Sequence, residues 1–338
     1  MPLETVLVVT SIAQSSHPIL QELAATSLAQ GVRFILVGDS PSPADFLLHG
    51  CDFYSIQSQL ETGFRLAQEA PKRHYSRKNI GYLIAIRQGA RVIVETDDDT
   101  RPSDGFWSPR SFCVLTRLQK ERGWNNVYKY FSTETVWPRG FPLDRVREPI
   151  AALPTALEDV GCPIQQGLID GSPDVDAVWR LTSGDALDFE KRAHVALGPG
   201  VWCPFNSQNT TWFEVAFPLL FLPSFCTFRM TDIWRSFVAQ RICWENGWHL
   251  CFHSPTARQE RNAHDLMDDF LQEIPGYLHN SEIASLLEGL SLRSGRDAIE
   301  ENLTVCYEAL VRAGHLPADE LNLLEAWLED LANLRVKC

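Results

Sequence analysis

The hydrophobic pattern of the first hundred residues alternates between short apolar runs and longer segments with apolar residues at helical spacing. The runs are rich in β-branched residues and predict buried strands. They lie at 5–10, 32–37, 52–56 and 91–96. The segments 18–30 and 76–88 predict helices, which Gly31 and Gly89 end. Strand and helix units that alternate in this way predict an α/β fold built on a doubly wound, largely parallel sheet.

The pattern changes after the last of these strands. The middle of the chain is rich in loops, with two segments, 126–131 and 175–181, that have the pattern of strands. An amphipathic helix is predicted over 228–244. Helical patterns then dominate to the C-terminus, at 263–270, 281–290, 297–313 and 318–334. We therefore expect an α/β domain over 1–261 and a helical C-terminal region over 262–338.

The composition is that of an ordinary globular protein, and its charge limits the possible ligands. The 338 residues include 30 Lys and Arg against 43 Asp and Glu, so the formal net charge is −13. We expect no binding of nucleic acid, because contact with its phosphates requires a cationic surface. A nucleotide ligand is compatible with this charge, since a metal ion can screen a diphosphate held near carboxylates.

The cysteines and the N-terminus bear on the cellular setting. The count of nine cysteines is odd and no two form a Cys-x-x-Cys pair, so we expect neither a disulfide framework nor a structural zinc site. The N-terminus lacks the basic region of a signal peptide. The longest apolar stretch, 215–225, contains two prolines and is too short to span a bilayer. We therefore expect a cytoplasmic protein without a transmembrane segment.

Three consecutive aspartates, Asp97, Asp98 and Asp99, follow the predicted strand at 91–96. Ligands of doubly wound sheets bind outside the carboxyl ends of the strands. Carboxylates at i and i+2 of an extended segment point to the same side, so Asp97 and Asp99 could hold one cation together. Such oxygen ligands favour Mg²⁺ or Mn²⁺, which would neutralise a departing nucleoside diphosphate. The alternative is a solvated acidic loop; the position after a buried strand favours the metal site.

Two polar segments offer candidate contacts with a nucleotide-sugar. Arg77, Lys78 and Asn79 open the second predicted helix, where cations and N-terminal amides can meet a pyrophosphate. Asn206, Gln208 and Asn209 carry amides, which both donate to and accept from sugar hydroxyls. The alternatives are a basic solvent-exposed helix face for the first segment and a turn rich in Asn and Ser for the second. Taken alone, each segment favours its structural alternative.

The start of the helix predicted after residue 227 supplies candidate catalytic residues, Arg229 and Asp232. Asp232 could act as a general base or hold an acceptor hydroxyl, although its spacing favours a helix N-cap. A histidine could complete the metal site as a third protein ligand, the candidates being His249, His253 and His264. His253 is the best of the three because it follows a short apolar segment in a polar loop, but a lone histidine is more often structural.

Six segments taken together resemble one known family. They are 77–82 (RKNIGY), 95–99 (ETDDD), 136–142 (VWPRGFP), 174–181 (DVDAVWRL), 203–210 (CPFNSQNT) and 228–235 (FRMTDIWR). In this order they resemble the STELLO-like putative glycosyltransferases, which are distantly similar to the reversibly glycosylated polypeptides, the UDP-arabinopyranose mutases. The resemblance extends over about residues 75–250. It implies a GT-A-type fold, with a Rossmann-like, mixed but mostly parallel sheet and a D-x-D metal site.

The resemblance also implies roles for individual residues. The aspartate triplet, Asp98 included, would contact the metal or the donor ribose, and the start of the preceding helix would lie near the nucleotide. Asp176 and Arg180 would border the donor sugar, and Asp232 would face the acceptor. Two differences between this sequence and the family limit how far these roles can be assigned here. Plant STELLO proteins resemble Golgi membrane proteins, whereas we expect no anchor here, and the segment around Arg139 is only loosely similar to the one whose arginine the mutases glycosylate.

We therefore expect a metal-dependent glycosyltransferase with a nucleotide-sugar donor, a UDP-sugar being favoured, and a carbohydrate or glycan acceptor. The cofactor would be Mn²⁺ or Mg²⁺. One alternative is a mutase that rearranges the sugar on its nucleotide, and another is a catalytically silent binding or scaffold protein of the same fold. The intact triplet and Asp232 favour the enzymes over the scaffold. The sequence leaves the sugar, the base, the stereochemical outcome and the oligomeric state open, and a homo-oligomer is compatible with it.

Overall fold

The computed structural model describes residues 4–184, 186–260 and 265–335. A mixed sheet of eleven strands runs through the molecule, and β7 and β11 form a separate pair. The strands are β1 (Thr5–Thr10), β2 (Arg33–Val37), β3 (Asp52–Tyr54), β4 (Val92–Thr96), β5 (Thr100–Pro102), β6 (Cys113–Gln119), β7 (Gly123–Trp124), β8 (Glu158–Gly161), β9 (Ile164–Gly171), β10 (Val195–Leu197), β11 (Val201–Trp202), β12 (Asn209–Phe213) and β13 (Leu250–Gln259). The α-helices are α1 (Pro18–Gln30), α2 (Ile56–Leu60), α3 (Arg65–Glu69), α4 (Lys78–Arg87), α5 (Ala177–Ser183), α6 (Thr231–Glu245), α7 (Leu266–Glu288), α8 (Ile299–Arg312) and α9 (Asp319–Arg335).

The N-terminal part of the sheet is parallel, as its strand and helix pattern predicts. Strands β3, β2, β1 and β4 follow one another in space, and each pair is parallel. Helix α1 ends where Gly31 adopts φ 67°, a left-handed conformation that glycine reaches without steric cost. Because β1 lies between β2 and β4, the carboxyl ends of three parallel strands meet at one edge of the sheet. This edge is where a ligand is expected.

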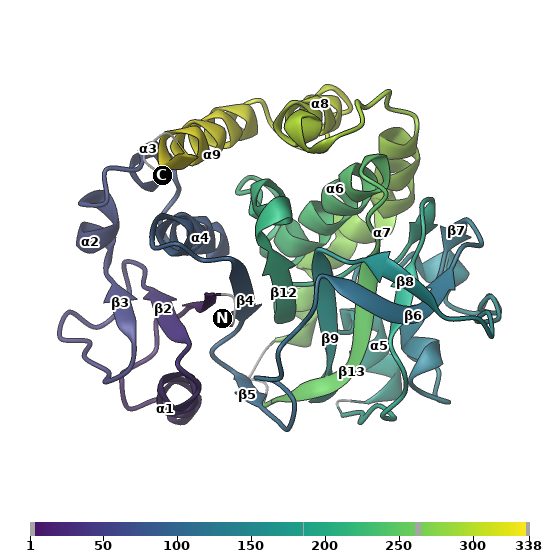
Figure 1. Cartoon of the computed structure of the whole chain (residues 1–338), viewed down its shortest axis with the longest axis horizontal. Coiled ribbons are helices and arrows are strands. Elements are labelled where there is room, and N and C mark those ends of the chain that lie inside the picture. Colours follow the sequence, from purple (N-terminus) through teal and green to yellow (C-terminus); the bar gives the residue numbers. More distant parts are fainter. Residues whose placement is uncertain (1–3, 185, 261–264, 336–338) are drawn as a thin grey trace.

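The remainder of the sheet is mixed. β12 runs antiparallel to both β4 and β9, and β13 is parallel to β9. Strands β10, β6 and β8 continue the sheet beyond β13, while β5 pairs with the end of β13. The predicted α/β architecture, a mixed sheet flanked by helices with a helical C-terminal extension, is confirmed (Figure 1).

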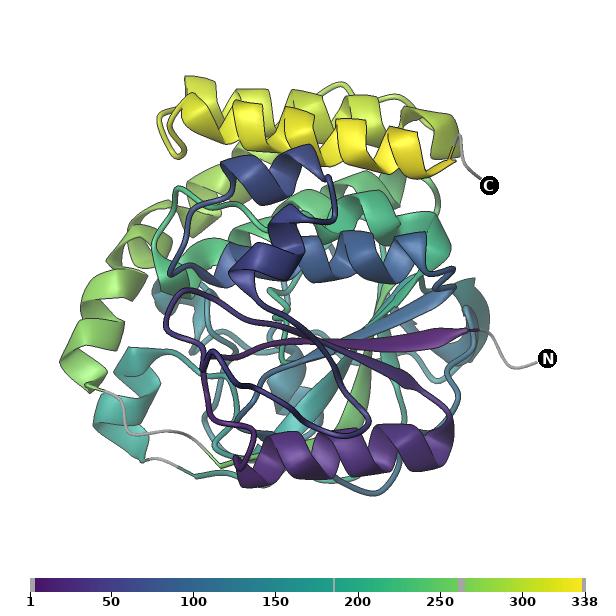
Figure 2. The ribbon, with the colours of Figure 1, turned by 90° about the vertical axis from the view of Figure 1, so that its left-hand side faces the viewer.

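The molecule is layered. Helix α1 packs on one face of the sheet, and α4 packs against β1 and β2 on the other face. Figure 2 shows this order from the side: α1 lies below the strands, α4 and α6 lie above them, and α8 and α9 form an outer layer. No helix among the residues that the structure describes is both long and apolar enough to cross a membrane.

Two segments predicted as strands are helical, so these predictions were wrong. Residues Val127–Tyr130 form a 3₁₀ helix. In the other segment, Asp176 accepts a hydrogen bond from the Trp179 amide and thereby caps α5. An N-cap carboxylate satisfies an amide that the first helical turn leaves without a partner, and here this local signal outweighs the apolar pattern.

The C-terminal helices are packed against the α/β part of the molecule. Two predicted helices merge into α7, which continues through Pro275, and residues 263 and 264 of the first lie outside the described ranges. The Asp330 carboxylate of α9 accepts hydrogen bonds from the amides of Arg65 and Leu66 at the start of α3. Residues of α8 and α9 share the main hydrophobic core with β1, β2 and α4. The division at residue 261 remains a prediction.

Candidate active site

A cavity of about 410 Å³ lies at the carboxyl ends of β1, β2 and β4. Its wall includes residues from the ends of these strands, namely Thr10, Ser11, Val37, Gly38, Asp97, Asp98 and Asp99. A smaller cavity of about 70 Å³ adjoins it and shares Tyr75, Asp97, Asp174, Phe228, Arg229 and Gln259 with it. The aspartate triplet is thus at the edge of the sheet where the strand pattern predicts it, and it faces a cavity.

Each aspartate of the triplet is held by a different neighbour. Asp97 Oδ1 accepts from the Tyr75 hydroxyl at 2.7 Å, and Asp98 accepts from the Ser11 hydroxyl. Asp99 Oδ2 accepts from the Gln259 side-chain amide at 2.8 Å. Burial, and then the charge of Asp97, raises the pKa of Asp99 to about 6, and burial also raises the pKa of Asp98. Three carboxylates therefore lie close together here, and the surrounding protein neutralises their negative charge only in part.

Lys78, one of the three residues predicted to open the helix at 76–88, contacts the aspartate triplet. Its fully buried ammonium donates to the Tyr75 hydroxyl at 2.6 Å, to the Thr96 carbonyl at 2.8 Å and to Asp97 Oδ1 at 3.1 Å. Lys78 is the first residue of α4, so it connects the start of this helix to the end of β4. The sequence pointed to the start of this helix, but sequence alone did not decide which of its side chains contacts Asp97.

Arg77 and Asn79, the expected nucleotide contacts, face the protein interior instead and line neither cavity. Arg77 donates to Gln59 Oε1 at 2.8 Å and to the Ala70 carbonyl at 3.0 Å. Asn79 exchanges two hydrogen bonds of 2.9 Å with the Leu222 backbone. Successive residues of a helix point about 100° apart, so one of three neighbours can face the site while the others point elsewhere. These two residues hold the scaffold in place.

Replacement of Lys78 by methionine should destabilise the fold by about 1–3 kcal/mol, because the Thr96 carbonyl and the Tyr75 hydroxyl lose a buried partner. Urea unfolding followed by circular dichroism measures this loss. Lys72→Met, on the exposed side of the same basic segment, is the control and should stay within about 0.5 kcal/mol of the unmodified protein. Equal effects of the two substitutions would contradict a buried role for Lys78.

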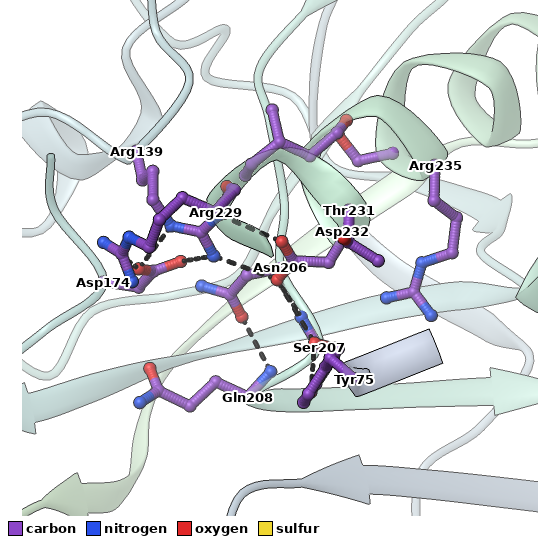
Figure 3. A network of polar contacts seen from close by, with 12 residues as sticks. Tyr75, Arg139, Asp174, Asn206, Ser207, Gln208, Arg229, Thr231, Asp232 and Arg235 are labelled. Atoms are coloured by element: carbon purple, nitrogen blue, oxygen red, sulfur yellow. Dashed lines mark hydrogen bonds and ion pairs between the residues drawn. The ribbon is translucent and has the colours of Figure 1, made fainter. Parts of the chain in front are cut away.

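A buried ion-pair network forms the wall of the smaller cavity (Figure 3). Arg139 makes two hydrogen bonds of 2.8 Å to Asp174 and two of 3.0 Å to Asp232. The Ser207 amide donates to Asp232 Oδ2 at 3.1 Å. Arg229 stands beside the network, where its guanidinium lies 2.8 Å from Glu273 Oε1 and 3.9 Å from Asp174 Oδ1.

The environment of Asp232 corrects two of its expected roles. It is not the N-cap of α6, because it lies inside the helix, after Thr231, and no side chain caps this end. Burial by itself would raise the pKa of Asp232, but the charge of Arg139 and its hydrogen bonds outweigh burial and hold the pKa at about 2. A carboxylate of such low basicity is a poor general base at neutral pH. The other role proposed for it, holding a hydroxyl, is compatible with this geometry.

One of the three amide side chains faces a cavity. Gln208 lines the smaller cavity, and its buried Oε1 has no hydrogen-bond partner within the described ranges. The side-chain oxygen of Asn206 instead accepts from the backbone N–H of Gln208 at 3.0 Å and shapes the turn. Asn209 lies in β12 and donates to the Leu168 carbonyl at 3.2 Å and to Thr256 Oγ1 at 2.9 Å. Asn206 and Asn209 thus make contacts within the protein and line neither cavity, and their predicted contacts with a sugar stay predictions.

Asp176, Arg180 and His253 do not reach either cavity. Asp176 is fully buried, where besides capping α5 it accepts from Trp137 Nε1 at 2.6 Å; burial raises its pKa to about 7. Arg180 donates to Ser172 Oγ at 2.8 Å. All three side chains contact the protein around them and lie outside the two cavities, so their predicted contacts with a ligand stay predictions.

The expected third metal ligand is also placed elsewhere. The ring nitrogens of His253 lie 2.8 Å from His194 Nδ1 and 2.9 Å from Gln165 Oε1. His253 is separated by a β-bulge from Gln259, the residue of β13 that contacts Asp99. His253 therefore contacts partners other than the triplet, its role as a metal ligand stays a prediction, and His264 lies outside the described residues.

Comparison with known proteins shows what this chain is similar to. Residues 229–338 match the family model described as STELLO glycosyltransferases. The chain is 31% identical over 332 residues to "Probable glycosyltransferase STELLO1" of Arabidopsis thaliana, a match that covers 92% of this chain and 42% of the relative. It is 29% identical over 341 residues to "Probable glycosyltransferase STELLO2" of the same plant, covering 95% of this chain and 44% of that protein. The chain thus spans less than half the length of these curated relatives.

Solved structures show weaker similarity. One is a mycobacterial protein, with a TM-score of 0.43 and 12% identity over 82% of this chain and 74% of that one. Another is the glucosyl-3-phosphoglycerate synthase of Mycobacterium tuberculosis in complex with phosphoglyceric acid, with a TM-score of 0.40 and 11% identity over 82% of this chain and 79% of that one. Similarities of this size carry no weight in assigning the site. The sequence comparisons confirm the resemblance seen in the motifs: this chain is similar over nearly all of its length to two STELLO glycosyltransferases of Arabidopsis thaliana, and its C-terminal third matches the model of that family.

Proposed function

We propose that this chain is a metal-dependent glycosyltransferase of the GT-A type. It would bind a nucleotide-sugar, a UDP-sugar being favoured, in the two adjoining cavities, which together form the cleft. The observation that carries the proposal is the aspartate triplet at the ends of parallel strands, where it lines a cavity of about 410 Å³. That volume lies within the range of small-molecule sites. The carboxyl ends of β1 and β2 would receive the nucleoside, as in other doubly wound sheets.

The residues present fit a hard divalent cation. The triplet offers oxygen ligands alone, which Mg²⁺ and Mn²⁺ prefer. The raised pKa values of Asp98 and Asp99 support a cation here, since positive charge would relieve the burial and crowding that disfavour ionisation. Asp97 and Asp99 would hold the ion, and Lys78 fixes the orientation of Asp97. The bound metal would neutralise charge on the leaving nucleoside diphosphate.

The smaller cavity is suited to the transferred sugar and the attacking hydroxyl. Gln208 presents an oxygen without a partner in the described structure, which can accept from a sugar hydroxyl. Asp232 remains ionised and is held rigidly by Arg139, so it can accept a hydrogen bond from an acceptor hydroxyl and orient it. Arg229 adds positive charge where the two cavities meet.

Calorimetric titration with UDP tests the proposal. We expect UDP to bind in the presence of Mn²⁺ and its affinity to fall at least about tenfold when the metal is removed with EDTA. Asp104→Asn, which changes an exposed aspartate outside both cavities, should bind as the unmodified protein does. Failure to bind UDP, or equal binding with and without metal, would refute the metal site. Product analysis with several UDP-sugars then distinguishes transfer from rearrangement or hydrolysis.

Asp232→Asn should leave the affinity for UDP and Mn²⁺ within about threefold while it lowers turnover by about 100-fold, because the acceptor hydroxyl loses its orienting charge. Arg139 keeps its paired contact with Asp174 in this variant. Donor binding by calorimetry and turnover by product formation measure the two effects separately. Asp159→Asn, at an exposed position of β8, is the control. Loss of donor binding in Asp232→Asn would place this residue on the donor side instead.

A further inference from the structure

A second cluster of metal-ligating side chains lies outside the cleft, between α7 and the turn that joins α8 to α9. It consists of His279 and Glu282, one helical turn apart on α7, and His315 in the turn. Their ligand atoms all lie within 4.8 Å of one another. Within the described ranges, no other group of three His, Cys, Asp or Glu side chains is placed to hold a metal ion in this way. We propose that His279, Glu282 and His315 bind a transition-metal ion of the Zn²⁺ type.

The separations suit a tetrahedral ion. His279 Nδ1 lies 3.3 Å from Glu282 Oε2, and His315 Nε2 lies 4.0 Å from the same oxygen. Ligands at about 2.0–2.1 Å from a tetrahedral zinc ion are about 3.4 Å apart. Small side-chain rotations therefore bring the three atoms into a coordination shell. The side chain of Glu282 is 62% exposed and has room to make such a rotation.

The buried imidazole of His315 is an independent observation that points to a ligand. Its side chain is 4% exposed, yet Nε2 makes no hydrogen bond within the part of the chain that the structure describes. A buried nitrogen without a partner carries the full cost of its desolvation, and a coordinated metal removes that cost. The ring packs beside Trp234, with centroids 6.5 Å apart, and beside His279, with centroids 5.2 Å apart. These contacts hold Nε2 toward Glu282.

The donor set selects the class of metal. Two imidazoles and one carboxylate favour Zn²⁺ and neighbouring transition metals over Mg²⁺ or Ca²⁺, which prefer oxygen alone. Three protein ligands leave the fourth position to water. The ion would cross-link α7 to the α8–α9 turn, and α7 also carries Glu273, the partner of Arg229 in the cleft. The protein would thus hold two different kinds of cation, a hard one at the triplet and a softer one here.

Titration with Co²⁺, a spectroscopic substitute for Zn²⁺, tests the site on the full chain. We expect one equivalent to produce the intense visible absorption of four-coordinate Co²⁺, and Zn²⁺ to displace it. The band should disappear in His315→Ala and His279→Gln and persist in His49→Ala, which changes an exposed histidine elsewhere. It should also persist in Asp99→Asn, which leaves this cluster intact, and in Cys113→Ser, which removes an exposed thiol.

Thermal unfolding provides a second measurement. Zn²⁺ should raise the melting temperature of the unmodified protein and of His49→Ala but not that of His279→Gln. His279 is 42% exposed, so this substitution tests the site even where His315→Ala fails to fold. Absence of the Co²⁺ band in the unmodified protein, its persistence in His279→Gln or its loss in Asp99→Asn would overturn the proposal.

Discussion

Asp99→Asn is expected to abolish the Mn²⁺-dependent binding of UDP while making the metal-free protein more stable at neutral pH. Asp99 is 7% exposed, and burial followed by the charge of Asp97 raises its pKa from 3.8 to about 6. A shift of this size corresponds to a cost of up to about 3 kcal/mol for keeping the side chain ionised, at about 1.4 kcal/mol per pKa unit. The asparagine removes this cost together with one ligand of the proposed metal.

The pH dependence of this effect has a definite sign. An acid whose pKa is raised in the folded state binds more protons when folded, so its ionisation lowers stability as the pH rises from about 4 to 6. The stabilisation of Asp99→Asn should therefore be complete above pH 6 and vanish below about pH 4. Urea unfolding across this range measures it, with Asp104→Asn as the control. A variant that is less stable than the unmodified protein at pH 7 would contradict the crowding of carboxylates in the cleft.

Arg139→Met should be the most destabilising substitution proposed here, with a loss of about 3–5 kcal/mol in the free energy of unfolding. The guanidinium is buried and makes two hydrogen bonds to Asp174 and two to Asp232. Its removal takes the hydrogen-bonded countercharge from both buried carboxylates and leaves Asp174 only the more distant Arg229, at 3.9 Å. Urea unfolding at pH 7 measures the loss.

The loss of unfolding free energy in Arg139→Met should be smaller in acid. Burial opposes ionisation of Asp232, but Arg139 outweighs it and depresses the pKa to about 2, so the stabilisation is present above about pH 4 and is lost as the pH falls toward 2. The matched control is Arg145→Met, whose guanidinium is 42% exposed and pairs with Glu148 at the surface. Exposed pairs contribute about 0–1 kcal/mol, so this control should change little. Similar losses for the two substitutions would show that the Arg139 network is not a buried one.

The strand and helix pattern of the N-terminal region could be predicted because it depends on local periodicity. Five-to-six-residue apolar runs describe strands buried on both faces, and β1 and α1 have the predicted bounds. The aspartate triplet could be placed for the same reason: it directly follows β4, and the edge at which parallel strands end is a property of the topology. The pattern failed at 175–181, where capping by Asp176 decides the conformation.

By itself, the sequence determined the fold class, the position of the carboxylates at a sheet edge and the family to which the chain is related. Tertiary structure alone decided which polar side chains contact the residues that line the cavities. Lys78 faces Asp97 while its neighbours Arg77 and Asn79 face the core, and Asp232 meets Arg139, 93 residues away in the chain. The physical reason is the distance along the chain over which each feature is determined. Periodicity and strand ends are set by neighbouring residues, whereas the direction of a buried polar side chain depends on a partner that folding brings from elsewhere.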